Sequence, residues 1–329
     1  MDNSGLKDAA RNMIKAVDMY HGGTVSEPQE LVLFLKDYDP LGKAGNQAPE
    51  AEVVSAPLDR WHLSTARNPV QEEKLTFPSY SPIRGGVRDD AVFYLYYQGS
   101  LVGKRVILWV PGYGVSDFAF RFIRKFFQAA LDRDYAVLFA TIPGHLERVK
   151  PDEKAGEGLL SADPKVNLET VAEAVGELKT GMDYLRSRGA ASFGGWGGSM
   201  GAAFLLLLSK EEQFTHLTLM IPVLDWTTIM SKAEMKPVAA RLAAAGYDSA
   251  LVKQAYDTVS PAFTASSAAP DRILLLYARQ DQLTPESVTI DYAKARSISR
   301  VLSYDESHST ILLNSHMFKD YGDFLDSLP

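Results

Sequence analysis

Residues 191–208 read ASFGGWGGSMGAAFLLLL, and they carry the clearest structural signal in the chain. Ala191 to Trp196 is a short apolar run typical of a buried strand, and Ala202 to Leu208 is typical of a buried helix. Between them, Gly197 and Gly201 flank Ser199 in the pattern G-x-S-x-G. Small neighbours let a chain turn sharply and hold a serine side chain clear of the backbone. The stretch therefore predicts a strand, a tight turn carrying an exposed serine, and a helix.

The chain on either side alternates between strand-like and helix-like segments. Strands are predicted at Lys74–Pro78, Ala91–Tyr97, Arg105–Val110, Tyr135–Ile142, Leu217–Pro222, Ile273–Tyr277 and Arg300–Tyr304. Helical stripes are predicted by Phe118, Phe122 and Phe126, by Val171, Val175, Leu178, Met182 and Leu185, and by the residues after Thr310. Nearly continuous apolar strands alternating with helices indicate the α/β class, with a mostly parallel sheet covered by helices on both faces.

Two segments do not fit the alternation. Residues 224–270 are helical and mixed, and we interpret them as a helical cap insertion, with a long crossover as the alternative. Residues 1–72 are interpreted as an N-terminal helical extension packed on the core, with an apolar stripe from Leu6 to Tyr20 and a short helix near Glu30 to Lys36. The catalytic domain is then expected to span residues 73–329.

Composition excludes several classes of protein. The 329 residues include no cysteine, which excludes a thiol nucleophile, disulfides and thiolate metal sites. A net charge of −7 argues against a nucleic-acid partner. No apolar run approaches the ~20 residues of a membrane span. The first residues lack the pattern of a secretory signal, so the sequence predicts a cytoplasmic location.

A nucleophilic serine needs a base, and His308 is the predicted one. It follows the strand Arg300–Tyr304, at the strand end where functional groups gather in open α/β sheets. His145 follows another strand and is the competing histidine; we assign it to the substrate pocket instead. Asp281, after the strand Ile273–Tyr277, is the predicted partner of the base, with Asp225 as the alternative.

The glycine-rich turn has a competing interpretation as a phosphate-binding loop. No Gly-Lys-Ser/Thr occurs, and the pattern G-x-G-x-x-G fails because its sixth position is Met200. An oxyanion hole needs two N–H donors, for which we predict the amides of Met200 and of Tyr113 in the loop Pro111-Gly112-Tyr113-Gly114. A plain tight turn would be equally glycine-rich at that loop.

These residues together resemble the α/β-hydrolase superfamily over roughly residues 73–329. The resemblance rests on the Pro-Gly-Tyr-Gly loop at 111–114, Ser199, Asp281 and His308, in that order along the chain. It implies a mostly parallel eight-stranded sheet, with residues 224–270 in the usual place of a cap. Many relatives have His-Gly where this chain has Pro111-Gly112, a change that leaves the Tyr113 amide available.

The predicted function is hydrolysis of carboxylic esters by a Ser-His-Asp triad through an acyl-enzyme, with no cofactor and no metal. The substrate is a small-molecule ester, with His145, Trp226 and Met230 expected to line its site. Peptidase, thioesterase or acyltransferase chemistry would use the same residues, and a non-catalytic ligand-binding protein is a further alternative. The stripe from Leu6 to Tyr20 fits a homodimer contact, a cover over the pocket, or docking on the chain's own core.

Overall fold

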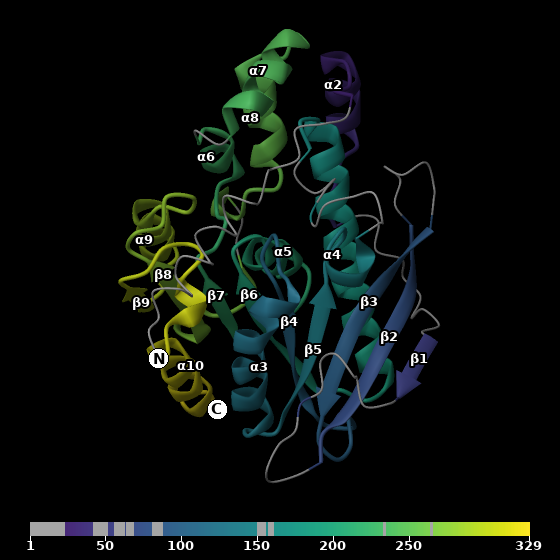
Figure 1. The fold of residues 1–329 in the computed structure, drawn as a ribbon, viewed down its shortest axis with the longest axis vertical. Coiled ribbons are helices and arrows are strands. Elements are labelled where there is room, and N and C mark those ends of the chain that lie inside the picture. Colours follow the sequence, from purple (N-terminus) through teal and green to yellow (C-terminus); the bar gives the residue numbers. More distant parts are fainter. Residues whose placement is uncertain are drawn as a thin grey trace.

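The computed structural model describes residues 24–41, 52–55, 63, 69–80, 88–149, 156, 161–232, 235–263 and 266–329. Its centre is a nine-stranded sheet with the order β1-β2-β3-β5-β4-β6-β7-β8-β9 (Figure 1). The strands are β1 (Glu52–Ser55), β2 (Gln71–Tyr80), β3 (Arg88–Tyr97), β4 (Arg105–Val110), β5 (Tyr135–Thr141), β6 (Ser192–Gly198), β7 (Leu217–Met220), β8 (Ile273–Ala278) and β9 (Arg300–Tyr304).

Six neighbouring strands of this sheet, from β5 through β4 and β6 to β9, run parallel. Strands β1, β2 and β3 form an antiparallel ribbon that joins the parallel part through an antiparallel β3–β5 pairing. The predicted class, a mostly parallel α/β sheet, is confirmed. The sheet has nine strands where eight were expected, because Glu52–Ser55, inside the segment predicted to be a helical extension, pairs with β2.

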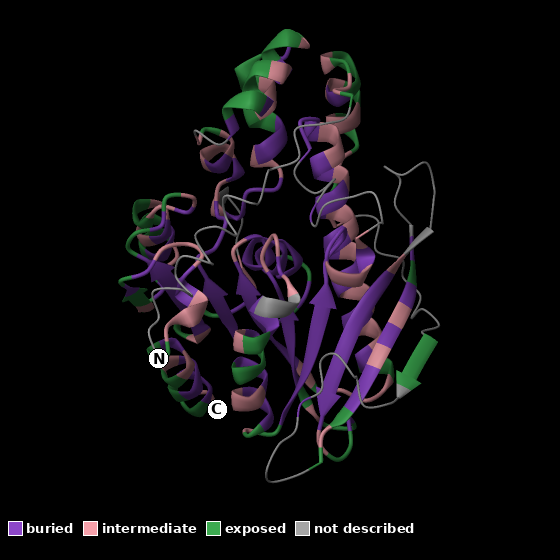
Figure 2. Cartoon of the chain, in the orientation of Figure 1, coloured by how far each residue is buried: buried purple, intermediate pink, exposed green. Residues whose placement is uncertain are grey.

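Helices cover both faces of the sheet, so its central parallel strands are buried, whereas the edge strand β9 is partly exposed (Figure 2). The longer described helices around the sheet are α3 (Asp117–Leu131), α4 (Pro164–Ser187), α5 (Met200–Leu208), α9 (Glu286–Ala295) and α10 (His316–Asp326). The core on the α4 and α5 face is mainly aliphatic. The core on the α3 and α10 face is rich in aromatic rings, including Trp109 and Trp196.

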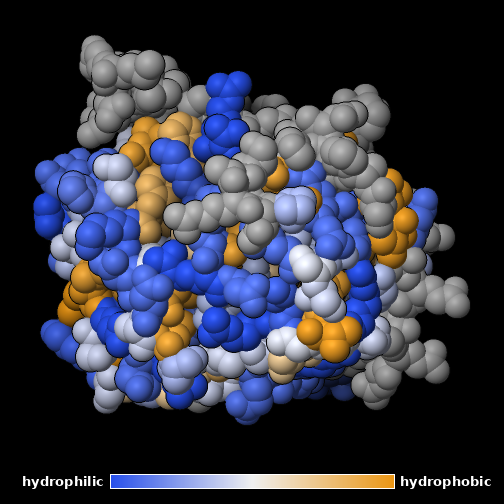
Figure 3. All heavy atoms as spheres, turned by 90° about the horizontal axis from the view of Figure 1, so that it is seen from below, coloured by the Kyte–Doolittle hydropathy of each residue, from blue (hydrophilic) through white to orange (hydrophobic). Residues whose placement is uncertain are grey.

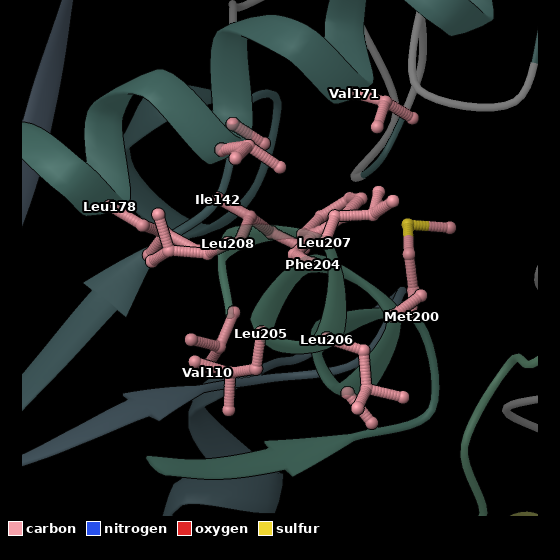
Figure 4. Packing of buried hydrophobic residues seen from close by; sticks show 14 of the residues in the cluster. Val110, Ile142, Val171, Leu178, Met200, Phe204, Leu205, Leu206, Leu207 and Leu208 are labelled. Carbon is pink, nitrogen blue, oxygen red and sulfur yellow. The ribbon is translucent and has the colours of Figure 1, made fainter. Parts of the chain in front are cut away.

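Helix α5 is buried along its whole length and anchors the turn at Ser199. Figure 4 shows Phe204 and the four leucines 205–208 of α5 gathered with Val110, Ile142 and Leu178. The helix approaches β6 closely because that strand carries glycine: a Cβ on Gly195 would lie 2.7 Å from Leu217 and 3.1 Å from Leu205. Close backbone approach of this kind is a reason for glycine inside a strand.

Beyond the carboxyl ends of the parallel strands lie α6 (Trp226–Met230), α7 (Lys236–Ala244) and α8 (Ser249–Asp257), with α2 (Pro28–Lys36) beside them (Figure 1). The short helix predicted near Glu30 to Lys36 is thus present. The Tyr247 hydroxyl donates to the Ser26 carbonyl at 3.1 Å, which joins the N-terminal segment to the predicted cap. The predicted helix from Leu6 to Tyr20 lies outside the described residues, and the division at residue 72 stays a prediction.

The opposite end of the molecule carries the amino ends of the parallel strands. Viewed from that end, the surface is mainly hydrophilic, with hydrophobic residues in separate small patches (Figure 3). Within the described ranges, no helix has both the length and the apolar character needed to cross a membrane.

Candidate active site

Ser199 occupies a strained turn between β6 and α5. Its backbone lies at φ 49° and ψ −114°, a region that side-chain-bearing residues rarely adopt. The Ser199 N–H donates to the Met220 carbonyl at 2.8 Å, which ties the turn to β7. A Cβ on Gly201 would lie 2.3 Å from the Val110 carbonyl oxygen, and one on Gly197 would lie 2.6 Å from the Ala202 Cα. Both glycines are therefore required for the close packing of the turn, as the G-x-S-x-G pattern predicts.

Three predicted side chains from three strand ends meet at this turn. The Ser199 Oγ lies 3.0 Å from the His308 Nε2, and the His308 Nδ1 lies 2.7 Å from the Asp281 Oδ2. The Asp281 carboxylate is fully buried, whereas 17% of the His308 side chain is exposed. This chain of hydrogen bonds can move a proton from the serine to the imidazole while a carboxylate holds the ring orientation.

The loop after β8 holds the Asp281 carboxylate in its ionised form. Burial alone would raise its pKa, but the adjoining His308 ring and hydrogen bonds from His308 and Thr284 lower the pKa below its ordinary value. The Leu283 and Thr284 amides donate to one carboxylate oxygen at 2.8 and 2.9 Å. The Thr284 hydroxyl donates to the other oxygen at 2.6 Å.

Thr284 was not singled out from the sequence. Its signal is the spacing Asp281-x-x-Thr284, which lets a side chain and its own loop satisfy each other locally. Asp225, the alternative acid, instead caps α6 by accepting from the Thr227 amide at 2.8 Å and the Thr228 hydroxyl at 2.8 Å.

The loop after β4 lies directly against the serine turn. A Cβ on Gly112 would lie 3.1 Å from the Ser199 Cβ and 3.2 Å from the Gly198 carbonyl oxygen. Gly114 has φ 74°, a conformation that favours glycine. Met200 is the first residue of α5, and the N–H of such a residue has no acceptor within its helix. The two backbone segments predicted to bind an oxyanion are therefore adjacent.

Comparison with solved structures bears on the whole arrangement. An acetyl xylan esterase from a Paenibacillus species superposes with TM-score 0.61 at 14% identity, covering 98% of this chain and 99% of that one. An S-formylglutathione hydrolase from Agrobacterium tumefaciens gives 0.57 at 14% identity, covering 81% and 98%. Acetyl xylan esterase 1 from a Thermoanaerobacterium species gives 0.56 at 13% identity, covering 92% and 96%.

The chain has the α/β-hydrolase fold. No protein-family model matches the sequence, and no curated protein sequence matches it significantly. The likeness is therefore one of structure, and the resemblance read from four short motifs is confirmed at the level of the fold.

In this α/β-hydrolase fold, a cavity of about 130 Å³ opens beside Ser199 and His308. Its walls come from strand ends and from the aromatic face of the sheet, and they include Trp109, Trp196, Ile123, Ile221 and Leu312. Trp109 and Trp196 stack with their ring centroids 4.1 Å apart. Sequence reasoning missed both indoles as pocket residues; their signal is that each precedes a glycine-containing loop by a few positions at the end of an apolar strand.

The three predicted substrate contacts are not among the described residues that line this cavity. Trp226 and Met230 belong to α6 and pack with the aliphatic core, so their role in substrate binding stays a prediction. His145 is fully buried behind the Tyr113 loop, where its Nε2 accepts from the Gly114 N–H at 2.9 Å. Its contact is therefore with this loop, and its role in substrate binding, like that of Trp226 and Met230, stays a prediction.

The remaining histidines are placed elsewhere. His216 is buried at the start of β7, and His316 is the first residue of α10. His21 and His62 lie outside the described residues. Among the described residues, no cluster of three or more His, Asp or Glu side chains could hold a metal ion.

Proposed function

We propose that this chain is a serine hydrolase that cleaves carboxylic esters. The observation that carries the proposal is the continuous hydrogen-bonded series Ser199–His308–Asp281 at the mouth of an apolar cavity. The structural likeness to two acetyl xylan esterases and an S-formylglutathione hydrolase supports the proposal.

The reaction uses the chain's own groups. As the Ser199 Oγ attacks the ester carbonyl carbon, its proton passes to the His308 Nε2, and the Asp281 carboxylate stabilises the resulting imidazolium. The carbonyl oxygen becomes an oxyanion, which the Met200 and Tyr113 amides stabilise; such donors contribute about 3 kcal/mol each to transition-state binding. His308 then gives its proton to the departing alkoxide. Water repeats the sequence on the acyl-enzyme and releases the acid.

The lining of the cavity supports a proposal for the substrate class. Its described lining contains no Asp, Glu, Lys or Arg, and the walls are mostly hydrocarbon. Burying an unpaired charge among such walls costs several kcal/mol. We therefore expect esters of small, uncharged acyl groups rather than acids that carry a second charge.

Labelling with a fluorophosphonate, beside a panel of p-nitrophenyl esters from acetate to octanoate, tests the proposal. The wild-type protein should be labelled and active, and Ser199→Ala should be neither. Amides and thioesters of the same acyl group distinguish peptidase and thioesterase activity, and an added alcohol acceptor detects acyl transfer. If the wild type turns over none of these substrates yet binds an ester as tightly as Ser199→Ala does, the chain is a binding protein and the proposal is wrong.

A further inference from the structure

The loop that follows β5 contains a histidine whose two ring nitrogens are both engaged. The His145 Nδ1 lies 2.9 Å from the Pro143 carbonyl oxygen, and the Nε2 lies 2.9 Å from the Gly114 amide nitrogen. A carbonyl oxygen only accepts a hydrogen bond, and a backbone N–H only donates one. The ring must therefore carry its proton on Nδ1 and present a lone pair at Nε2.

Its surroundings keep this ring neutral. The His145 side chain is completely buried, and burial lowers its pKa to about 4. The nearby Arg148 guanidinium acts in the same direction. A protonated ring would have two donors and could not accept from Gly114. The neutral ring with its proton on Nδ1 thus satisfies both neighbours at physiological pH.

The backbone around His145 is itself rigidly held. The Arg148 guanidinium donates to the Thr141 carbonyl at 2.9 Å and to both carboxylate oxygens of Glu177 at 2.7 and 2.8 Å. Arg148 is buried, and Glu177 belongs to α4, so this ion pair fixes the loop between the sheet and a long helix. Bidentate arginine–carboxylate pairs restrict both distance and orientation.

The hydrogen bond from Gly114 joins His145 to the Tyr113 loop. The Tyr113 ring packs edge-on against the His145 ring, with centroids 5.4 Å apart at 82°. A Cβ on Gly156 would lie only 2.3 Å from the Tyr113 ring, and its φ of 83° also favours glycine. Gly114, whose amide His145 holds, directly follows the residue whose amide is proposed to face the oxyanion.

We propose that His145 is a positioning residue, which holds the Tyr113 amide in place for the oxyanion by accepting a hydrogen bond from Gly114. The inference rests on the proposed esterase function and goes beyond it, because it assigns a role to a side chain that does not line the cavity. Oxyanion donors act mainly on the transition state, and displacement of a reacting group by about 1 Å can cost about 100-fold in rate. Loss of the Gly114 bond should therefore lower kcat and leave KM nearly unchanged.

Two substitutions distinguish the roles of the two ring nitrogens. The amide of His145→Gln reaches about as far as Nε2 and can still accept from Gly114, whereas that of His145→Asn reaches only as far as Nδ1. We expect His145→Asn to lower kcat by about 10- to 100-fold, with KM within about threefold, and His145→Gln to keep kcat within about fivefold of the wild type.

His216→Asn and His216→Gln are matched controls, because His216 is also buried, with its pKa likewise lowered to about 4, but lies at the other end of the sheet. Both should lose stability with kcat within about twofold of the wild type. Nitrogen-15 NMR of the wild-type imidazoles provides a readout that needs no variant to fold, and His145 should show the tautomer with the proton on Nδ1.

The outcomes separate this inference from the proposed function. A proton on Nε2, an unchanged kcat in His145→Asn, or equal losses in the Asn and Gln variants would each overturn the positioning role while Ser199→Ala remains inactive. If Ser199→Ala itself retains wild-type ester hydrolysis, the proposed function fails first, and the positioning role fails with it.

Discussion

The buried histidines at the two ends of the parallel strands differ in their hydrogen bonds. At the carboxyl end, both ring nitrogens of His145 bond to backbone, one of them in a different loop. At the amino end, the His216 Nδ1 contacts only the neighbouring Thr215 hydroxyl at 3.1 Å, and its Nε2 has no hydrogen-bond partner in the described part of the chain. Burial makes both rings neutral. What differs is whether the ring controls the position of another segment.

This difference follows from parallel topology. In such a sheet the loops after the strands gather at one edge, and functional groups collect there. Ser199, Asp281 and His308 are on three of these loops, and Gly114 and His145 are on two more. The hydrogen bonds that link these five residues therefore lie at the carboxyl edge. Turns at the amino edge also bond to one another, since the Gly103 N–H donates to the Gly189 carbonyl at 2.8 Å, but they carry none of the five residues.

The largest effect is expected from breaking the carboxyl edge at Asp281→Asn. An amide cannot stabilise the imidazolium and can turn the ring to the wrong tautomer, so kcat for a p-nitrophenyl ester should fall by about 10³- to 10⁴-fold. Asp225→Asn is the matched control, because Asp225 serves as the N-cap of α6 and asparagine is also a good N-cap residue. Comparable losses in both variants would contradict the assignment of Asp281.

The next largest effect is expected from replacing glycine by alanine, and it should differ between the two edges. Gly201→Ala forces a Cβ to within 2.4 Å of two backbone carbonyl oxygens and should lower the unfolding free energy by more than about 3 kcal/mol. Gly103, in the turn before β4, has φ 77° with open space around it, so Gly103→Ala should cost only about 1 kcal/mol. Urea denaturation measures both, and equal costs would show that the crowding at Gly201 is relieved by movement.

The smallest effect concerns pH and applies to both edges. In the folded chain, the pKa of each of these histidines is lowered to about 4, whereas in the unfolded chain it is about 6.5. As pH falls below 6.5, the unfolded chain therefore takes up protons that the folded chain does not. The stability that the buried neutral ring provides above pH 6.5 is thus lost as pH falls toward 4. At pH 4.5 each buried ring should lower the free energy of unfolding by about 2.5 kcal/mol. Between pH 7.5 and 4.5, the free energy of unfolding of His216→Gln should therefore fall by about 2.5 kcal/mol less than that of the wild type. Identical losses in urea titrations would exclude this origin.

Much of the fold could be predicted because its signals are local. The strands at Arg105–Val110 and Arg300–Tyr304 have the predicted limits. The four-residue strand Glu52–Ser55 was missed because half of its residues are polar and it is stabilised by pairing with β2. Short edge strands of this kind depend on their partner more than on their own composition.

Local signals specify the serine turn, the strand-and-helix alternation and the candidates for the partners of the serine, because glycine spacing, apolar runs and strand-end loops act over a few residues. Which of these candidates meet depends on how the whole sheet is assembled. His308 is 109 residues from Ser199 and 27 from Asp281, and their contact depends on β4 lying between β5 and β6 with β7, β8 and β9 following in order. The contact of His145 also depends on the sheet. Its Nε2 accepts from the Gly114 amide 31 positions earlier, because β4 and β5, which these two loops follow, pair in parallel.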